Sequence, residues 1–353
     1  MTHRITGALG TLDSLDFRDG MAEAAGWLLH PEHAIEAVQV RIDGRVLGAA
    51  PVIARPDVAA AFPTVPHAAA SGFRVAGAWA PTRPLLRVET IGLAGERPAV
   101  GGEEYWPADG PPDLPTPDAV LMERVSAGVE PTRFNRAGLD IAAQLLAEVR
   151  RHLPGVAVPR LLDWGCGPGR ATRFMPGLWP GLRPVGCDID ASAIAWCRAN
   201  VPDASFHATD PLPPLPFAAG AFDAVVAASV MTHLAWPMQL RWLDEIHRVL
   251  APGGVFVASV HGPLAAVGLP ADQRAELSRR GVLDGAHDGR LDGIAPEGYY
   301  RATYQTERHT RRHWRHGFAI RAWRAGGLSN WQDLVVLQRT ERQGWLARLL
   351  RRA

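Results

Sequence analysis

The chain has 353 residues, 47% of them hydrophobic, with 37 basic and 36 acidic side chains and a net charge of +1. Every basic residue is an arginine, which excludes pyridoxal-phosphate enzymes and Walker A loops because both require a lysine. No apolar run reaches the ~18 residues of a membrane helix, and we expect no secretory signal. The three cysteines form no CxxC pair, which favours a reduced, cytoplasmic setting.

The first part of the chain has the pattern of short β-strands. Val38, Val40 and Ile42 alternate with polar neighbours, as in a half-buried strand, and Asp43-Gly44 then favours a type I′ hairpin. Further strands are expected at 22–29, 45–48, 71–79 and 85–93. Several short strands separated by turn residues predict a small all-β, sandwich-like domain over residues 1–106.

A segment with five prolines in twelve residues, 107–118, is predicted to be a linker. After it, residues 119–342 alternate between strands and helices. Strands are expected at 158–163, 183–188, 204–209, 223–230 and 253–260, and helices at 138–152, 170–177, 191–200 and 237–250. This βαβ order predicts an α/β domain with a parallel sheet and helices on both faces, which segments 317–323 and 333–339 could close as a hairpin.

The first strand of this domain runs into a glycine-rich turn, Gly165-Cys166-Gly167-Pro168-Gly169. Glycines let a ligand approach the backbone closely, and the amide groups of a following helix would face that ligand. The spacing is GxGxG rather than the GxGxxG of a dinucleotide loop. Asp163 stands two residues before the first glycine, where a carboxylate would repel a pyrophosphate and suit a cation. These two features disfavour a nicotinamide oxidoreductase.

Two further acids follow the next strands. Asp188 lies one βα unit after the loop, where a carboxylate can accept hydrogen bonds from ribose hydroxyls. Asp210 follows the third strand and could accept from an adenine amino group, or it could only cap a turn. Acids at three successive strand ends describe a ligand with an amine, a ribose and an adenine, and S-adenosylmethionine has these parts.

The segments LLDWGCGPGR, VGCDID, LPFAAGAFDAVVAASVMTHL and HRVLAPGGVFVASV resemble bacterial class I S-adenosylmethionine-dependent methyltransferases. The resemblance implies a seven-stranded Rossmann-like sheet, with S-adenosylmethionine as cofactor and S-adenosylhomocysteine as product. It also implies a set of cofactor-binding residues, which are Asp163, Gly165, Cys166, Gly167, Asp188, Ile189, Asp210 and Ser229. Cys166 could instead be a small packing residue, since nothing beside it resembles a base.

Candidate residues for the transfer step follow the fourth and fifth strands. His233 is the first candidate for a general base and His261 the second, although each could equally be a buried structural histidine. A further set is expected to line the acceptor pocket, and it consists of Thr232, Tyr299, Tyr300 and Tyr304. The polar insertion 263–300 is a candidate substrate lid. No metal site is expected.

The sequence leaves the acceptor open. A sugar or polysaccharide hydroxyl is one candidate, and a small natural product or a lipid headgroup is the alternative. A binding protein without turnover is a third possibility. Residues 301–353 hold 12 arginines against three acids, yet a nucleic-acid acceptor is disfavoured because no aromatic-studded basic groove accompanies them. Residues 343–353 are expected to form a basic amphipathic tail; contact with a membrane surface is one interpretation, and a frayed end, favoured because the tail is only two turns long, is the other. The oligomeric state stays open.

Overall fold

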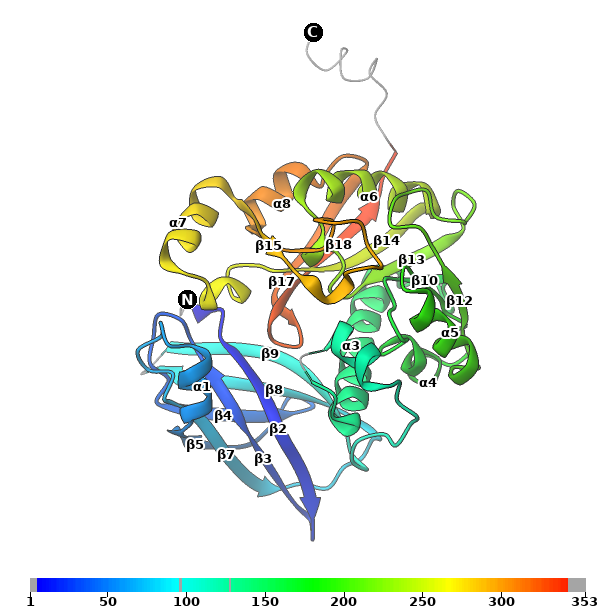
Figure 1. Ribbon diagram of the computed structural model, residues 1–353. Helices are drawn as coiled ribbons and strands as arrows, with labels where there is room; N and C mark the ends of the chain where they lie inside the picture. The colour runs from blue at the N-terminus through cyan, green and yellow to red at the C-terminus, as the bar shows by residue number, and fades with distance from the viewer. Residues whose placement is uncertain (1–4, 95–96, 127, 342–353) are drawn as a thin grey trace.

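A computed structural model describes residues 5–94, 97–126 and 128–341 of the chain. Two β-sheets form the N-terminal part, defined here as residues 5–107, and a seven-stranded sheet with helices forms the C-terminal part, residues 119–341. Figure 1 shows the two parts stacked, with helix α3 and the turn between β17 and β18 beside the N-terminal sheets. The predicted tail 343–353 lies outside the described residues.

The N-terminal part has a five-stranded and a four-stranded sheet. The first has the order β1 (Ile5–Thr6), β9 (Arg97–Pro107), β8 (Leu85–Ala94), β4 (Ala37–Ile42), β5 (Arg45–Pro51). The second has the order β2 (Leu9–Arg18), β3 (Met21–Leu29), β7 (Ala70–Ala78), β6 (Ile53–Ala54), and helix α1 (Pro56–Ala61) follows β6. One hydrophobic cluster contains residues of both sheets, among them Leu28, Phe73, Val40 and Trp106.

The predicted type I′ hairpin is confirmed. Asp43 and Gly44 have φ angles of 49° and 80°, and Ile42 pairs with Arg45 across the turn between β4 and β5. Asp and Gly suit this turn because both central residues need a positive φ.

The predicted seven-stranded sheet of the C-terminal part is also confirmed. Its order is β12 (Ser205–Ala208), β11 (Val185–Asp188), β10 (Leu161–Trp164), β13 (Phe222–Ala227), β14 (Leu250–Val260), β18 (Gln332–Arg339), β17 (Phe318–Leu328). The first five strands are parallel, whereas β18 runs antiparallel to both β14 and β17. The carboxyl ends of β10, β11 and β13 therefore meet at one edge, where ligands bind in such sheets.

Helices cover both faces of this sheet. Side chains of α3 (Pro131–His152) and α4 (Met175–Leu178) share one buried cluster with one face. Side chains of α6 (Trp236–Val249) share a second cluster with the other face, together with Trp314 at the end of α8 (Glu307–His313). Helix α5 (Ala191–Asn200) packs near β12 through Ile194 and Cys197.

Two helix boundaries differ from the sequence prediction. Helix α3 begins at Pro131 rather than at 138, because the Glu130 carboxylate caps it by accepting from Thr132 N at 2.9 Å and Arg133 N at 2.5 Å. The helix expected at 170–177 is instead a 3₁₀ turn, Thr172–Phe174, followed by the one-turn helix α4. Helix α4 contains a glycine, Gly177, which has a low helix propensity and disfavours a longer helix.

The insertion 263–300 is structured rather than a simple loop. It contains two 3₁₀ turns, a helix and a strand, which are Ala265–Gly268, Gly289–Leu291, α7 (Ala271–Arg280) and β15 (Val282–His287). Strand β15 pairs with β16 (Arg301–Gln305) to form a separate two-stranded sheet. Within the ranges that the structure describes, no helix has both the length and the apolar character to cross a membrane.

Hydrogen bonds join the two parts of the chain. Asn330, in the turn between β17 and β18, accepts from Gly102 N at 2.7 Å through its side-chain oxygen. The Gln144 side chain of α3 donates to the Glu103 carbonyl at 2.6 Å and accepts from Ser329 N at 2.9 Å. Strand β9 is therefore tied both to α3 and to the β17–β18 turn.

Candidate active site

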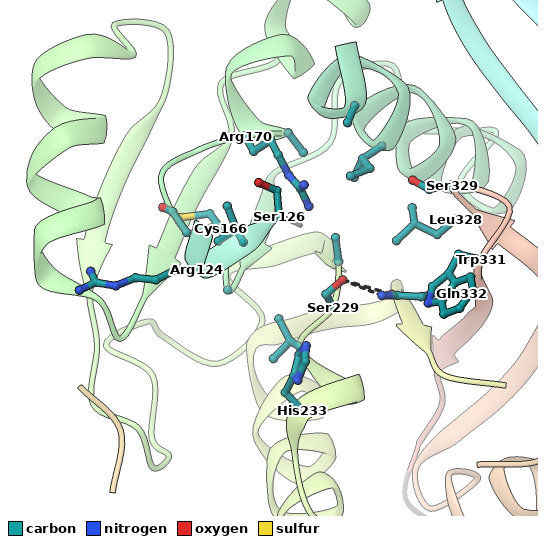
Figure 2. Close-up of a pocket in the computed structure, with 18 of the residues that line it drawn as sticks. Arg124, Ser126, Cys166, Arg170, Ser229, His233, Leu328, Ser329, Trp331 and Gln332 are labelled. Atoms are coloured by element: carbon teal, nitrogen blue, oxygen red, sulfur yellow. Dashed lines mark hydrogen bonds between the residues drawn. The ribbon is translucent and has the colours of Figure 1, made fainter. Parts of the chain in front are cut away.

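A cavity of about 910 Å³ lies where the two parts meet. Its walls come from the ends of β10, β11 and β13, from the N-terminal half of α3, from the β17–β18 turn, and from strands β2 and β3 of the N-terminal part. Figure 2 shows Arg170, Ser126, Ser229 and His233 arranged around this space. The volume lies near the upper end of the range for small-molecule pockets, roughly 300–1,000 Å³.

The glycine-rich turn forms one wall in a conformation that only glycine adopts easily. Gly165, Gly167 and Gly169 have φ angles of 74°, 52° and 68°. A Cβ atom on Gly165 would stand 2.2 Å from Val230 Cγ2, and one on Gly167 would stand 2.8 Å from Val125 Cγ1. Glycine is therefore required here for two reasons: the backbone has positive φ angles, and Val230 and Val125 pack too close to leave room for a Cβ atom.

Asp163 lies at the carboxyl end of β10 and is 3% exposed. Its Oδ2 atom accepts from Thr172 Oγ1 at 2.5 Å. Burial raises its pKa to about 6, and the hydrogen bond from Thr172 opposes that shift. The side chain lines the cavity without a basic partner among the described residues, so a cation entering the cavity would stabilise its ionised form and lower its pKa.

Asp188 ends β11 and organises the adjoining loops. Its two carboxylate oxygens accept from Gly167 N at 2.7 Å and from Asp190 N at 2.8 Å, while burial raises its pKa. Each carboxylate oxygen can accept a second hydrogen bond, so Asp188 can still bind hydroxyl groups of a ligand.

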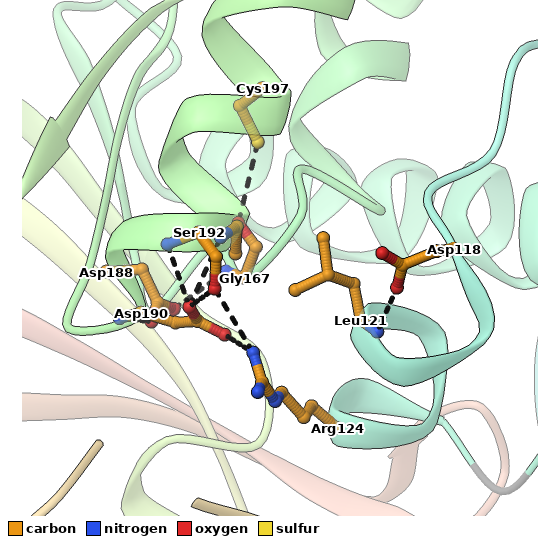
Figure 3. A network of polar contacts seen from close by, with 9 residues as sticks. Asp118, Leu121, Arg124, Gly167, Asp188, Asp190, Ser192 and Cys197 are labelled. Carbon is orange, nitrogen blue, oxygen red and sulfur yellow. Dashed lines mark hydrogen bonds and ion pairs between the residues drawn. The ribbon is translucent and has the colours of Figure 1, made fainter. Parts of the chain in front are cut away.

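Helix α2 (Ala119–Val125) is held beside this loop by an ion pair. Arg124 Nη1 lies 2.6 Å from Asp190 Oδ2, and Asp190 also caps α5 by accepting from Ser192 N at 3.0 Å (Figure 3). The network thus connects α2, the start of α5 and the end of β11, and it fixes the edge of the cavity.

Arg170, which directly follows the glycine-rich turn, lines the cavity although the sequence prediction did not include it. Its side chain points into the cavity (Figure 2). Burial lowers its pKa to about 10, and no acid among the described residues pairs with it. Arg133, at the start of α3, is a second cavity-lining arginine; it is exposed, and its charge helps to lower the pKa of the neighbouring Glu130. Two such cations favour an anionic ligand group.

Ser229 is held in a left-handed conformation at the cavity wall, with a φ of 60°. Ser229 N donates to Ser259 Oγ at 2.7 Å, and Gln332 Nε2 donates to Ser229 Oγ at 2.9 Å (Figure 2). Such strain in a residue other than glycine persists only where neighbouring groups impose it, and it is common at binding sites.

His233 and His261 both line the cavity, each beside a tyrosine ring. His233 stacks on Tyr300 with ring centroids 4.1 Å apart, and His261 stacks on Tyr304 at 5.0 Å. Burial lowers the pKa of His233 to about 3 and that of His261 to about 4. Both imidazoles are therefore uncharged at neutral pH.

The remaining predicted residues divide into two groups. Gly165, Cys166, Ile189 and Tyr299 line the cavity, and the Tyr299 hydroxyl also accepts from Trp242 Nε1 at 3.0 Å. Three others are not among the residues that line it, and these are Thr232, Tyr304 and Asp210. Thr232 is fully buried, and Asp210 is exposed while its neighbour Thr209 borders the cavity.

Cys166 lines the cavity and also packs in the protein core. It belongs to a buried cluster with Ile194, Cys197 and Phe206, and burial raises the pKa of its thiol. A raised thiol pKa opposes a nucleophilic role.

Comparisons with known proteins match the same segment. Residues 161–254 match the family described as methyltransferase domain, which confirms the resemblance predicted from the sequence. Trans-aconitate 2-methyltransferase of Methylobacterium radiotolerans is 31% identical over 134 residues, which cover 38% of this chain and 48% of the relative. A probable S-adenosylmethionine-dependent methyltransferase of Mycolicibacterium smegmatis is 30% identical over 152 residues, which cover 42% and 55%.

The chain spans about half the length of the curated relatives it matches. Among solved structures, an S-adenosylmethionine-dependent methyltransferase from Mesorhizobium loti aligns with a TM-score of 0.42 and 23% identity, over 57% of this chain and 100% of that one.

Proposed function

Because residues 161–254 carry a methyltransferase domain of the class I type, we propose that this protein transfers a methyl group from S-adenosylmethionine to a small-molecule acceptor and releases S-adenosylhomocysteine. One observation carries the proposal. The glycine-rich turn, the buried Asp163 and the strand-end Asp188 all border a single cavity, and their chemistry matches the parts of this cofactor.

The residues present fit the cofactor group by group. Asp163 would attract the ammonium and sulfonium charges, and Arg170 would pair with the methionine carboxylate. Asp188 has free acceptor capacity for the ribose hydroxyls, while Ile189 would pack against the adenine ring. Gly165, Cys166 and Gly167 would supply backbone close to the methionine chain. Ser229 would border the same region of the cavity.

For the acceptor we propose a carboxylate oxygen. When bound, S-adenosylmethionine supplies a methyl group on a positively charged sulfur, which a carboxylate oxygen can attack in one displacement. An ionised carboxylate needs no base, and this agrees with two imidazoles whose low pKa makes them weak bases at neutral pH. Several relatives are named for trans-aconitate, a polycarboxylate, and none of those described here is named for a sugar. The sugar hydroxyl is therefore not favoured.

The roles of the transfer-site residues follow from this choice. His233 and His261 would border the reacting atoms as uncharged groups that exclude water, and Tyr300 would hold the His233 ring in place. Arg133 would pair with the acceptor carboxylate. Alignment of the two reacting groups would then be the main contribution of the protein to the rate.

The acceptor class can be tested by the stability of the product. We expect incubation with methyl-labelled S-adenosylmethionine and a panel of carboxylic acids to give a labelled product that releases methanol in mild base, as methyl esters do. The panel should include trans-aconitate, aliphatic acids and aryl-substituted acids. Sugars and amines serve as the comparison, since ethers and methylamines keep the label in base. A base-stable product would overturn the carboxylate proposal, and no transfer with any acceptor would favour a binding protein without turnover.

Cofactor binding is expected to depend on pH through Asp163. Its pKa of about 6 in the free protein means that the carboxyl group is ionised at pH 7 and largely protonated at pH 5. Protonation removes the partner of the ligand ammonium, so the Kd for S-adenosylhomocysteine should rise about tenfold from pH 7 to pH 5. Calorimetric titrations at several pH values measure this, with near-UV circular dichroism to verify folding. The Asp163→Asn variant should show a flatter profile, and a wild-type Kd that stays constant would contradict the assignment.

We also infer that the two N-terminal sheets form a sandwich-like domain. One hydrophobic cluster shared by both sheets supports this. The long strands also pair antiparallel, β2 with β3 and β3 with β7 in one sheet and β4 with β8 in the other. The boundaries 1–106, 107–118 and 119–342 stay predictions.

A further inference from the structure

The cavity extends well beyond the region bordered by Asp163, Asp188 and Arg170, which we call the cofactor half. Its second half is bordered by the N-terminal part and by the β17–β18 turn rather than by the strand ends that carry Asp163 and Asp188. The lining residues of the N-terminal part are Gly10, Thr11, Trp27, Ala61 and Glu104. Those of the turn include Leu328, Trp331 and Gln332, which Figure 2 shows on one side of the space.

An aromatic wall joins the two parts in this half. The rings of Trp27 and Phe62 have centroids 5.7 Å apart, and the rings of Phe62 and Trp331 have centroids 6.2 Å apart. Trp27 and Trp331 are each half-buried and line the cavity, while Phe62 is packed behind them in a hydrophobic cluster. Such a wall offers flat apolar surface to a ligand at low conformational cost.

The polar groups of this half are already paired within the protein. Glu104 Oε1 accepts from Leu12 N at 2.9 Å, and Arg136 lies 3.6 Å from Glu104 Oε2. Asp140 Oδ1 accepts from Tyr105 N at 2.7 Å. Arg136 is thus the cation of this half that lies beside Glu104, and that carboxylate competes with any ligand carboxylate for it. A polycarboxylate would place its additional charges against Trp27, Trp331 and Glu104, which is unfavourable.

From this arrangement we propose that the acceptor is a carboxylic acid with an apolar, aryl or alkyl body, and that Trp27 and Ala61 of the N-terminal part determine acceptor specificity. The apolar body lies along Trp27 and Trp331, and the single carboxylate points toward the methyl group. This inference rests on the proposed methyltransferase function, and it separates the acceptor from trans-aconitate, for which the curated relatives are named.

The test uses the full chain saturated with S-adenosylhomocysteine, so that cofactor binding is established first. Calorimetric titration with 4-phenylbutyrate and with trans-aconitate then compares an apolar monocarboxylate with a polycarboxylate. We expect 4-phenylbutyrate to bind at least tenfold more tightly. Equal or tighter binding of trans-aconitate, or no binding of 4-phenylbutyrate, would overturn the inference. Failure of S-adenosylhomocysteine itself to bind would instead refute the proposed function.

Helix α1 offers a matched pair of variants. Ala61 and Ala60 are both exposed neighbours on this helix, but only Ala61 lines the cavity. Ala61→Trp should narrow the acceptor half and weaken 4-phenylbutyrate binding at least fivefold, whereas Ala60→Trp should leave it unchanged. Neither substitution should alter the Kd of S-adenosylhomocysteine by more than twofold. An equal response of the two variants would contradict the placement.

Trp27→Ala removes the aromatic surface itself. It should weaken 4-phenylbutyrate binding about tenfold and leave trans-aconitate and S-adenosylhomocysteine unaffected. Because Trp27 also packs on Phe62, the thermal unfolding of the Trp27→Ala variant is measured in parallel. If this variant does not fold, the comparison of Ala61→Trp with Ala60→Trp decides the question. Unchanged 4-phenylbutyrate binding in a folded Trp27→Ala protein would overturn the role of Trp27.

Discussion

Replacing Asp188 with alanine is expected to weaken S-adenosylhomocysteine binding at least 100-fold. Hydrogen bonds to a charged acceptor contribute about 1.5–3 kcal/mol each, and two ribose hydroxyls would lose their acceptor together. The substitution also removes the acceptor for Gly167 N and Asp190 N, which lie 2.7 and 2.8 Å from the carboxylate oxygens. The glycine-rich turn and the start of α5 would both lose a constraint. Isothermal titration calorimetry measures the change in Kd directly.

Asp203 provides the matched control for this experiment. It is an exposed aspartate that pairs with Arg183 at the surface, away from the cavity. Asp203→Ala removes the same charge, and surface ion pairs contribute little to stability, so both the Kd and the unfolding temperature should stay close to the wild-type values. Asp188→Asn keeps one acceptor oxygen and should have an intermediate effect. Binding by Asp188→Ala within threefold of wild type would refute the cofactor site.

The second large effect is expected at Gly138, in the middle of α3. A Cβ atom there would stand 2.1 Å from the Arg170 carbonyl oxygen and 2.9 Å from a ring carbon of Phe174. Overpacking against backbone costs about 3 kcal/mol, and the better helix propensity of alanine recovers about 1 kcal/mol. Gly138→Ala should therefore lower the free energy of unfolding by about 2 kcal/mol, measured by denaturant titration.

The same substitution should also affect ligand binding, because Arg170 directly follows the glycine-rich turn. If α3 and the turn separate to relieve the clash, the Arg170 side chain moves with its backbone and S-adenosylhomocysteine binds more weakly. Gly155→Ala is the control, since a Cβ atom at Gly155 meets nothing within 4 Å. It should change the unfolding free energy by less than about 0.5 kcal/mol. Equal stability of the two variants would contradict the close packing at Gly138.

The cofactor half of the site could be predicted because its signals are local. The acid, the glycines and the next strand-end acid lie within one βα unit, and the parallel sheet brings successive strand ends together. Arg170 also lies within this stretch, but the cofactor motif itself does not single it out. The side-chain direction of Arg170 depends on how the turn packs against α3, and that packing involves a contact 32 residues away at Gly138.

The N-terminal sheets were harder to predict because two of their strands are irregular. In β2 the buried residues Leu12 and Leu15 are three residues apart, since the pairing with β3 shifts between Leu12 and Ser14. This bulge breaks the alternation that identifies a strand. Strand β9 contains two prolines and two adjacent glycines, which are typical of a loop. Both strands are fixed by their neighbours rather than by local propensity.

The acceptor half was beyond reach for a different reason. Trp27, Ala61 and Trp331 are far apart in the sequence and meet only through packing between the two parts. No sequence spacing relates these three residues, and each one, considered alone, is indistinguishable from an ordinary core or surface residue.

The ties between β9, α3 and the β17–β18 turn have a consequence for folding. Gly102, Glu103 and Tyr105 each use a main-chain group to bond a side chain of the C-terminal part, and Leu264 and Val267 extend the hydrophobic cluster that contains Leu9 and Phe62. Separating the parts would expose this apolar surface to water and break three hydrogen bonds made by main-chain groups. We therefore expect both parts to melt in a single cooperative transition, and fragments cut within the proline-rich segment to reassociate rather than persist as independent proteins.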